Sequence, residues 1–249
     1  MMPDAATVVT LGLTFLLAGT VKGVIGLGLP TVSLALLAIA FDLTTAMALL
    51  LVPSALTNLW QALVGGHFTR LLRRLWPMLT LATLTVWIGA LALTRVDLAW
   101  LTALLGLSIA LYAALSLSGL RARVKPGREA WIGPLAGIFN GVLTGMTGSF
   151  VVPGVMYLQA LGLARDQMIQ AMGILFTLST LALAAVLANR FLSLELAAWS
   201  CAALLPALLG MLLGQKIRRL LSERVFRRVF FSALLVLGIY ILASALIAG

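Results

Sequence analysis

Two glycine-rich stretches decide the fold of this 249-residue chain, VKGVIGLGLP at residues 21–30 and NGVLTGMTG at residues 140–148. Each lies midway in a long apolar region, at residues 5–40 and 131–162. Either region is too long for one crossing, because a helix needs roughly 20 residues to span the hydrocarbon core. Glycines permit the tight turns that interrupt a helix. We therefore predict that each region is a helix pair folded back on itself.

The composition is that of an all-α integral membrane protein. Hydrophobic residues make up 62% of the chain and charged residues 10%, whereas soluble domains carry about 25% charged residues. Cys201 and His67 are the only cysteine and the only histidine. A disulfide framework, a cysteine–histidine metal cluster and a cysteine–histidine catalytic pair are therefore excluded within one chain, and we expect no cofactor.

The basic residues predict the orientation of the chain in the membrane. The net charge is +10, and basic residues gather in the polar breaks at residues 65–76, 119–130 and 215–228. Lys and Arg are retained on the cytoplasmic side of membrane proteins. We therefore assign these three breaks to the cytoplasm, and interpret the charge as an orientation signal rather than as a nucleic-acid site.

Threading the chain through these breaks gives two halves of opposite orientation. The predicted spans are 43–64, 77–94 and 98–118 in the first half, and 168–188, 196–214 and 229–247 in the second. The organisation is thus a first repeat at 1–120, a basic cytoplasmic linker at 121–130 and a second, inverted repeat at 131–249. The second folded-back pair divides into arms of about 13 and 14 residues, short for a full crossing, which favours re-entrant hairpins.

The two halves also resemble each other in sequence. AMALLLVPS at 46–54 matches AMGILFTLS at 171–179, and three glycines of the first half, Gly19, Gly23 and Gly26, match Gly137, Gly141 and Gly145. Inverted repeats with paired glycine- or proline-interrupted segments are typical of transporters whose substrate site lies near the midplane between the repeats.

Lys22 is the only charged residue placed deep inside an apolar region. Burying a lysine at the bilayer centre costs on the order of 3 kcal/mol. The acidic residues all fall at the ends or breaks of the predicted spans, so an anionic substrate is the natural counterion. Alternatively, Lys22 lies in a loop between two full crossings and reaches water, and the neighbouring glycines are helix-packing sites.

Neutral polar residues form a second candidate group. Thr57, Asn58 and Gln61 lie near the end of one predicted span, with Asn58 and Gln61 on one helical face. Thr144 and Ser149 add hydroxyl donors at the second glycine-rich stretch, and Asn140 adds an amide. Such groups can bind carboxylate or sulfonate oxygens without adding charge. For any single residue, hydrogen bonding between helices is the alternative interpretation.

The chain resembles the sulfite exporter TauE/SafE family, also called TSUP transporters. The resemblance rests on VKGVIGLGLP, PSALTNLWQ and GIFNGVLTGMTGSFVVP and covers nearly the whole chain. It implies a multi-span transporter of the bacterial cytoplasmic membrane, linked to sulfite, sulfonates and related organic anions. It also implies that the motif glycines and the prolines that follow them line a central cavity, at Gly19, Gly23, Gly26, Gly28 and Pro30 and at Gly137, Gly141, Gly145, Gly148 and Pro153. Many members have a run of glycines where this chain reads GLGLP and TGSFVVP, a departure that leaves the anion open.

The expected substrate-binding residues therefore come from both halves. They are Lys22, Gly23, Gly26, Gly28, Thr57, Asn58, Gln61, Asn140, Gly141, Thr144, Gly145, Gly148 and Ser149.

We expect alternating access: a small anion binds between the two hairpin tips, and the repeats rock around it. An anion channel is the runner-up, because a positive tip with hydroxyl groups also describes a selectivity constriction. An enzyme is disfavoured, since no nucleophile and base lie within plausible reach. The expected partners are the small anion and the lipid bilayer, with no nucleic acid, and a homodimer is left open.

Overall fold

A computed structural model of the chain describes residues 5–120, 123–125, 127–188, 193–218, 220 and 222–248. Every regular element in these ranges is a helix. Among them, six helical segments are long and apolar enough to cross a membrane, and a bent helix pair brings the number to seven. The prediction of an all-α integral membrane protein is confirmed.

Some of the predicted features fall outside the described residues. These are Asp4 at the start, residues 121, 122 and 126 of the predicted linker, and residues 189–192 of the break before the span at 196–214.

The first glycine-rich stretch separates two helices, as predicted. α1 (Ala5–Ile25) has 21 residues, and α2 (Leu29–Ala40) has 12. Between them the backbone turns at Gly26, with φ 78°, and at Gly28, with φ 107°, a left-handed conformation that residues with a Cβ rarely adopt. Pro30 lies in the first turn of α2, where its missing N–H is not needed.

The second glycine-rich stretch also ends a helix, but the predicted arm lengths are wrong. α8 (Glu129–Thr147) has 19 residues and α9 (Gly154–Ala160) only seven, in place of two arms of similar length. The prediction placed the break within NGVLTGMTG at residues 140–148. α8 runs through Gly141 and Gly145 and ends only at the last glycine of this stretch, Gly148, with φ 72°. Whether either hairpin is re-entrant stays a prediction.

The predicted span at 43–64 is bent in the middle. α3 (Leu43–Leu49) and α4 (Leu51–Leu63) meet at an angle of 45°. Pro53 has no N–H to offer the carbonyl of Leu49, four residues earlier. Ser200 of α11 (Leu194–Ile217) compensates: its hydroxyl donates to Leu49 O at 2.9 Å and accepts from Val52 N at 3.0 Å.

The remaining predicted spans correspond to long helices. α5 (Phe68–Leu84), α6 (Val86–Ala90) and the 3₁₀ turn η1 (Leu91–Thr94) form one continuous segment that includes most of the basic break predicted at 65–76. α7 (Leu98–Ser118) has the predicted bounds. α10 (Arg165–Ala188), α11 and α12 (Glu223–Ala248) each extend beyond their predicted spans.

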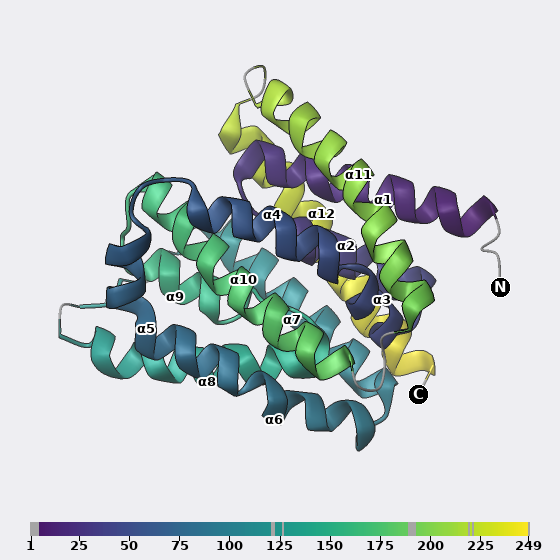
Figure 1. The fold of residues 1–249 in the computed structure, drawn as a ribbon, viewed down its shortest axis with the longest axis horizontal. Coiled ribbons are helices and arrows are strands. Elements are labelled where there is room, and N and C mark those ends of the chain that lie inside the picture. The colour runs from purple at the N-terminus through teal and green to yellow at the C-terminus, as the bar shows by residue number, and fades with distance from the viewer. Residues whose placement is uncertain are drawn as a thin grey trace.

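The helices pack in pairs that join the two halves of the chain. Figure 1 shows α1 crossing α11 on one side of the molecule, and α5 and α6 beside α8 on the opposite side. Between these two groups, α4 packs against α10, and α7 packs against α12. Each of these contacts unites a helix of residues 1–120 with a helix of residues 131–249.

Glycines allow the helix backbones to approach closely in two of these pairs, α1 with α11 and α5 with α8. A Cβ on Gly19 would collide with the backbone carbonyl of Ala207 in α11, and one on Gly23 with that of Met211. In the other pair, Gly137 meets Met78 O. Small residues let helix backbones approach closely in membranes. The same use of glycine therefore occurs in both halves.

The predicted cytoplasmic breaks share one face of the molecule. Arg74 of α5 forms a bidentate ion pair with Glu129 of α8, with distances of 3.0 and 2.6 Å. This ion pair joins the break at 65–76 to the end of the predicted linker. The orientation inferred from charge is consistent with this arrangement.

Candidate functional site

Lys22 lies in the last turn of α1 and is buried, with 4% of its surface exposed. Its ammonium nitrogen donates to Thr57 Oγ1 at 3.0 Å and to Asn58 Oδ1. Thr57 accepts this bond because its own hydroxyl hydrogen goes to Pro53 O, at 2.6 Å. The structure thus brings Lys22 together with Thr57 and Asn58, which were predicted as a separate group and lie 35 and 36 positions later in the chain. We call Lys22, Thr57 and Asn58 the lysine centre.

The two hydrogen bonds use two of the three hydrogens of an ammonium group. Both acceptors are neutral side chains, and neither bond is an ion pair. A buried charge is normally paired with an opposite charge or neutralised. The lysine centre therefore has the chemistry of an incomplete anion site.

Gln61 lies one helical turn beyond the lysine centre and has a different environment. Its amide nitrogen donates to Gly26 O and to Ile169 O, both at 2.8 Å. The side chain thereby fastens the turn between α1 and α2 to the start of α10. Because both amide hydrogens are used by the protein, Gln61 acts as a clamp in this structure. Its predicted role in substrate binding stays a prediction.

Asn140 occupies the position in α8 that matches Lys22 in α1, since each precedes the first glycine of its stretch, Gly141 or Gly23. It is fully buried, and its Oδ1 accepts from Gly154 N at the start of α9, at 3.0 Å. This hydrogen bond holds the start of α9 against α8. A lysine at position 140 could not make it, because an ammonium group cannot accept a hydrogen bond.

The hydroxyls of Thr144 and Thr147 at the second turn are used internally, and Ser149 takes part in these bonds through its backbone. Thr144 donates to Ser149 O at 3.0 Å, and Ser149 N donates to Thr147 Oγ1 at 3.2 Å. Both Thr144 and Ser149 are buried. They stabilise the turn at Gly148, and their predicted contact with substrate stays a prediction.

Four other buried polar atoms have no hydrogen-bond partner among the described residues in this part of the molecule. They are the hydroxyls of Ser54 and Ser179 and the amide nitrogens of Asn58 and Asn140. All four can donate a hydrogen bond. Leaving a buried donor unpaired costs about 1–3 kcal/mol. Ser54 was not predicted, although it ends the repeated motif at 46–54 as Ser179 ends the one at 171–179.

Three predicted site glycines lie against helix backbones. Gly23 faces Met211 and Gly214 of α11, Gly141 faces Ala82 and Thr85, and Gly145 faces Val86 and Gly89 at α6. The packing interpretation of these glycines therefore matches their contacts. Their predicted role in binding substrate stays a prediction.

The two hairpin tips have different neighbours. Gly26 lies beside Ile169 of α10, and Gly28 beside Phe230 of α12. Gly148 lies beside Leu34 and Met47, in α2 and α3. The expectation of an anion held between the tips has no support from these contacts, whereas the lysine centre lies a turn deeper in α1.

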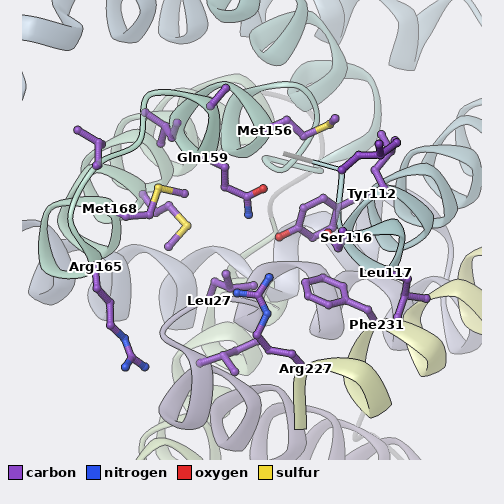
Figure 2. A pocket seen from close by; sticks show the side chains of 18 of the residues that line it. Leu27, Tyr112, Ser116, Leu117, Met156, Gln159, Arg165, Met168, Arg227 and Phe231 are labelled. Atoms are coloured by element: carbon purple, nitrogen blue, oxygen red, sulfur yellow. The ribbon is translucent and has the colours of Figure 1, made fainter. Parts of the chain in front are cut away.

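A large cavity opens at the face where the predicted cytoplasmic breaks meet. Its volume is about 910 Å³, and it is lined by the ends of α7, α9, α10 and α12 and by the tip residues Ile25 and Leu27. Five arginines line it: Arg123, Arg165, Arg224, Arg227 and Arg228. We call this space the arginine cavity. Figure 2 shows the Arg227 guanidinium pointing toward the space that the Tyr112 hydroxyl and the Gln159 amide also face.

The arginine cavity and the lysine centre are separated by the Gln61 clamp. Ile169, one of the two residues that Gln61 holds, lines the cavity. Gly26, the other, lies between the lining residues Ile25 and Leu27. Gln61 is in turn three residues from Asn58 in α4. The clamp therefore connects the wall of the cavity to the helix that carries Thr57 and Asn58.

The sequence interpretation missed the arginine cavity. The arginines were visible in the sequence, but the positive-inside rule accounts for them as an orientation signal. Their convergence depends on the packing of α7 and α12, which no local pattern reports. Tyr112, which is 1% exposed and contacts Phe231 edge-to-face, was likewise not singled out.

The family model described as "Sulfite exporter TauE/SafE" matches residues 11–241, nearly the whole chain. The chain belongs to the TauE/SafE family. The TauE/SafE match includes both hairpins and all of the predicted site residues.

Membership of the TauE/SafE family makes this chain a multi-pass membrane protein of a transporter family. No curated protein and no solved structure matches the chain.

Proposed function

We propose that this chain is a secondary transporter that moves a small anion, namely sulfite, an organosulfonate or a related organic anion, across the bacterial cytoplasmic membrane by alternating access. The observation that carries the proposal is the lysine centre. Lys22 is buried in an apolar helix, and its hydrogen-bond partners are the neutral Thr57 and Asn58. An anion supplies the missing counter-charge and offsets the cost of burying the lysine.

The unpaired donors support an anion in particular. The free atoms of Ser54, Asn58, Asn140 and Ser179 are all donors, and oxyanions are acceptors with several lone pairs. A cation would meet the wrong polarity at the two amide nitrogens, which can only donate. In this proposal an anion that has lost its water finds replacement hydrogen bonds in the protein, and the charge-assisted ones are the strongest.

The clamp supports alternating access rather than an open pore. Gln61 holds the turn at Gly26 to Ile169, a residue of the cavity wall, with two hydrogen bonds, and in this proposal that clamp closes the way from the cavity to Lys22. Release of the clamp would join the cavity to the lysine centre. The pairing of helices also supports an inverted repeat, because exchanging the halves maps the α1–α11 contact onto the contact of α8 with α5 and α6.

Transport assays on the purified protein in liposomes test this proposal. We expect saturable uptake of labelled sulfite, taurine or sulfoacetate, with counterflow, which a channel would not give. Lys22→Ala should abolish uptake, and Lys22→Arg should retain part of it, because a guanidinium keeps the charge with different geometry. Uptake that is unchanged in Lys22→Ala would remove the lysine centre from the mechanism. Uptake that does not saturate would favour the channel.

A further inference from the structure

The arginine cavity has features that orientation in the membrane does not require. Its five arginines come from three separate parts of the chain, residue 123, residue 165 and residues 224–228, and converge on one space. An orientation signal needs basic residues on the correct face, but not around a common cavity. Arg70 and Arg73 belong to the same predicted face and do not line the cavity.

The charge around the cavity is of one sign. None of the described residues that line it is acidic. Arg227 is held in place by Phe231, with its guanidinium carbon 5.6 Å from the ring centroid, a favourable cation–π geometry. A concave surface lined by one sign of charge raises the local concentration of the opposite ion. The cavity therefore favours anions.

A second observation points to a bound ligand. Tyr112 lines the cavity and is 1% exposed, and its hydroxyl makes no hydrogen bond of normal geometry with the described residues, although the side chains of Ser116 and Gln159 lie close to it. Figure 2 shows this hydroxyl and the Gln159 amide directed toward the space that the Arg227 guanidinium enters. Buried tyrosine hydroxyls normally have a partner. An acceptor placed here would satisfy Tyr112, Gln159 and Arg227 together.

We infer that the arginine cavity is an anion-binding site in its own right, separate from the lysine centre. It binds an oxyanion group, of the carboxylate, sulfonate or phosphate kind, through Arg227, Tyr112 and Gln159. The other arginines attract the anion to this position. Guanidinium groups suit this ligand, because they donate two parallel hydrogen bonds to one oxyanion.

The site lies on the cavity side of the Gln61 clamp, so its occupancy does not depend on Lys22. Bound at this position, a soluble anion is concentrated ahead of the closed clamp. The same oxyanion chemistry is present in the headgroup of an anionic lipid, which is the second source of a ligand for this cavity.

Binding of radiolabelled sulfate to the full chain in phosphatidylcholine nanodiscs tests the inference. The measurement is made in Lys22→Met, which removes the charge of the lysine centre and leaves the cavity intact. We expect saturable binding that weakens at least tenfold in Lys22→Met/Arg227→Gln, since a charge-assisted hydrogen bond contributes about 1.5–3 kcal/mol. Lys22→Met/Arg70→Gln is the matched control: it loses one charge from the same face outside the cavity, and should bind as well as Lys22→Met.

The outcomes separate this inference from the proposed function. Absence of saturable binding in Lys22→Met, or an equal loss in the Arg70 and Arg227 variants, would overturn the arginine site while leaving the lysine centre untouched. Arg227→Lys shows whether the weaker binding of Arg227→Gln comes only from a folding defect. Because lysine keeps the charge, Arg227→Lys should recover part of the sulfate affinity.

Nanodiscs that contain phosphatidylglycerol identify the source of the ligand. Sulfate binding that persists there indicates a soluble anion. Sulfate binding that disappears, together with phosphatidylglycerol that stays on the wild type but not on Arg227→Gln in native mass spectrometry, indicates a lipid headgroup. A loss of sulfate binding with no lipid retained on the wild type would count against a specific site.

Discussion

The two halves of the molecule share their packing but differ in their chemistry. In both, a glycine-bearing helix lies against the backbone of a helix from the other half, through Gly19 in one case and Gly137 in the other. At matching positions on these helices stand Lys22, which reaches α4, and Asn140, which fixes the start of α9. The halves therefore share the glycine contacts of these helices and differ in the charge at the matching position.

The largest expected effect comes from breaking the shared packing. Gly19→Val and Gly137→Val should each lower the free energy of unfolding by about 3 kcal/mol or more, because the added side chain meets an immovable backbone. Gly12→Val is the control, since nothing lies within 4 Å of a Cβ there. Thermal unfolding in detergent measures all three. A loss at Gly19 with none at Gly137 would show that the packing is not shared.

Exchanging Lys22 and Asn140, the residues that differ between the halves, should have the next largest effect. We expect Lys22→Asn/Asn140→Lys to transport anions roughly a hundredfold more slowly, because a charged hydrogen-bond donor contributes up to about 3 kcal/mol. The lysine at 140 also removes the acceptor of Gly154 N. Initial uptake rates in liposomes give the answer. Wild-type rates in the exchanged protein would mean that the halves are chemically equivalent.

The smallest effects concern the matched serines. Ser54→Ala and Ser179→Ala should each slow transport by roughly three- to tenfold, as one neutral hydrogen bond to the anion is lost, with little change in unfolding. Thr180→Val is the control for Ser179, because Thr180 is equally buried but donates to Phe176 O of its own helix. Equal rates in Ser179→Ala and Thr180→Val would remove Ser179 from the anion path.

Local chemistry explains which features the sequence predicted. The turn at Gly26 and Gly28 and the candidates Lys22, Thr57 and Asn58 were found because a charge and amides stand out against an apolar background. The end of α8 was misplaced because a glycine looks the same in a turn and in a helix contact, and only the neighbouring backbone of α5 distinguishes them.

Long-range contacts account for what was missed. The bend before Pro53 depends on Ser200, 151 residues away from its acceptor Leu49, and the arginine cavity depends on three segments folding together. Gln61 was singled out with Thr57 and Asn58 as part of one polar group, but its hydrogen bonds to Gly26 O and Ile169 O are tertiary. No single-sequence pattern carries such information.

The glycine contacts also determine which parts of the molecule can move as rigid bodies. α1 belongs to the first half but is tied to α11 of the second, and α8 of the second half is tied to α5 and α6 of the first. The halves therefore cannot rock apart as intact units without losing backbone contacts. If the protein works by the proposed alternating access, we expect the crossed pairs, each drawn from both halves, to be the bodies that move, with α4 and α10 packed against each other between them.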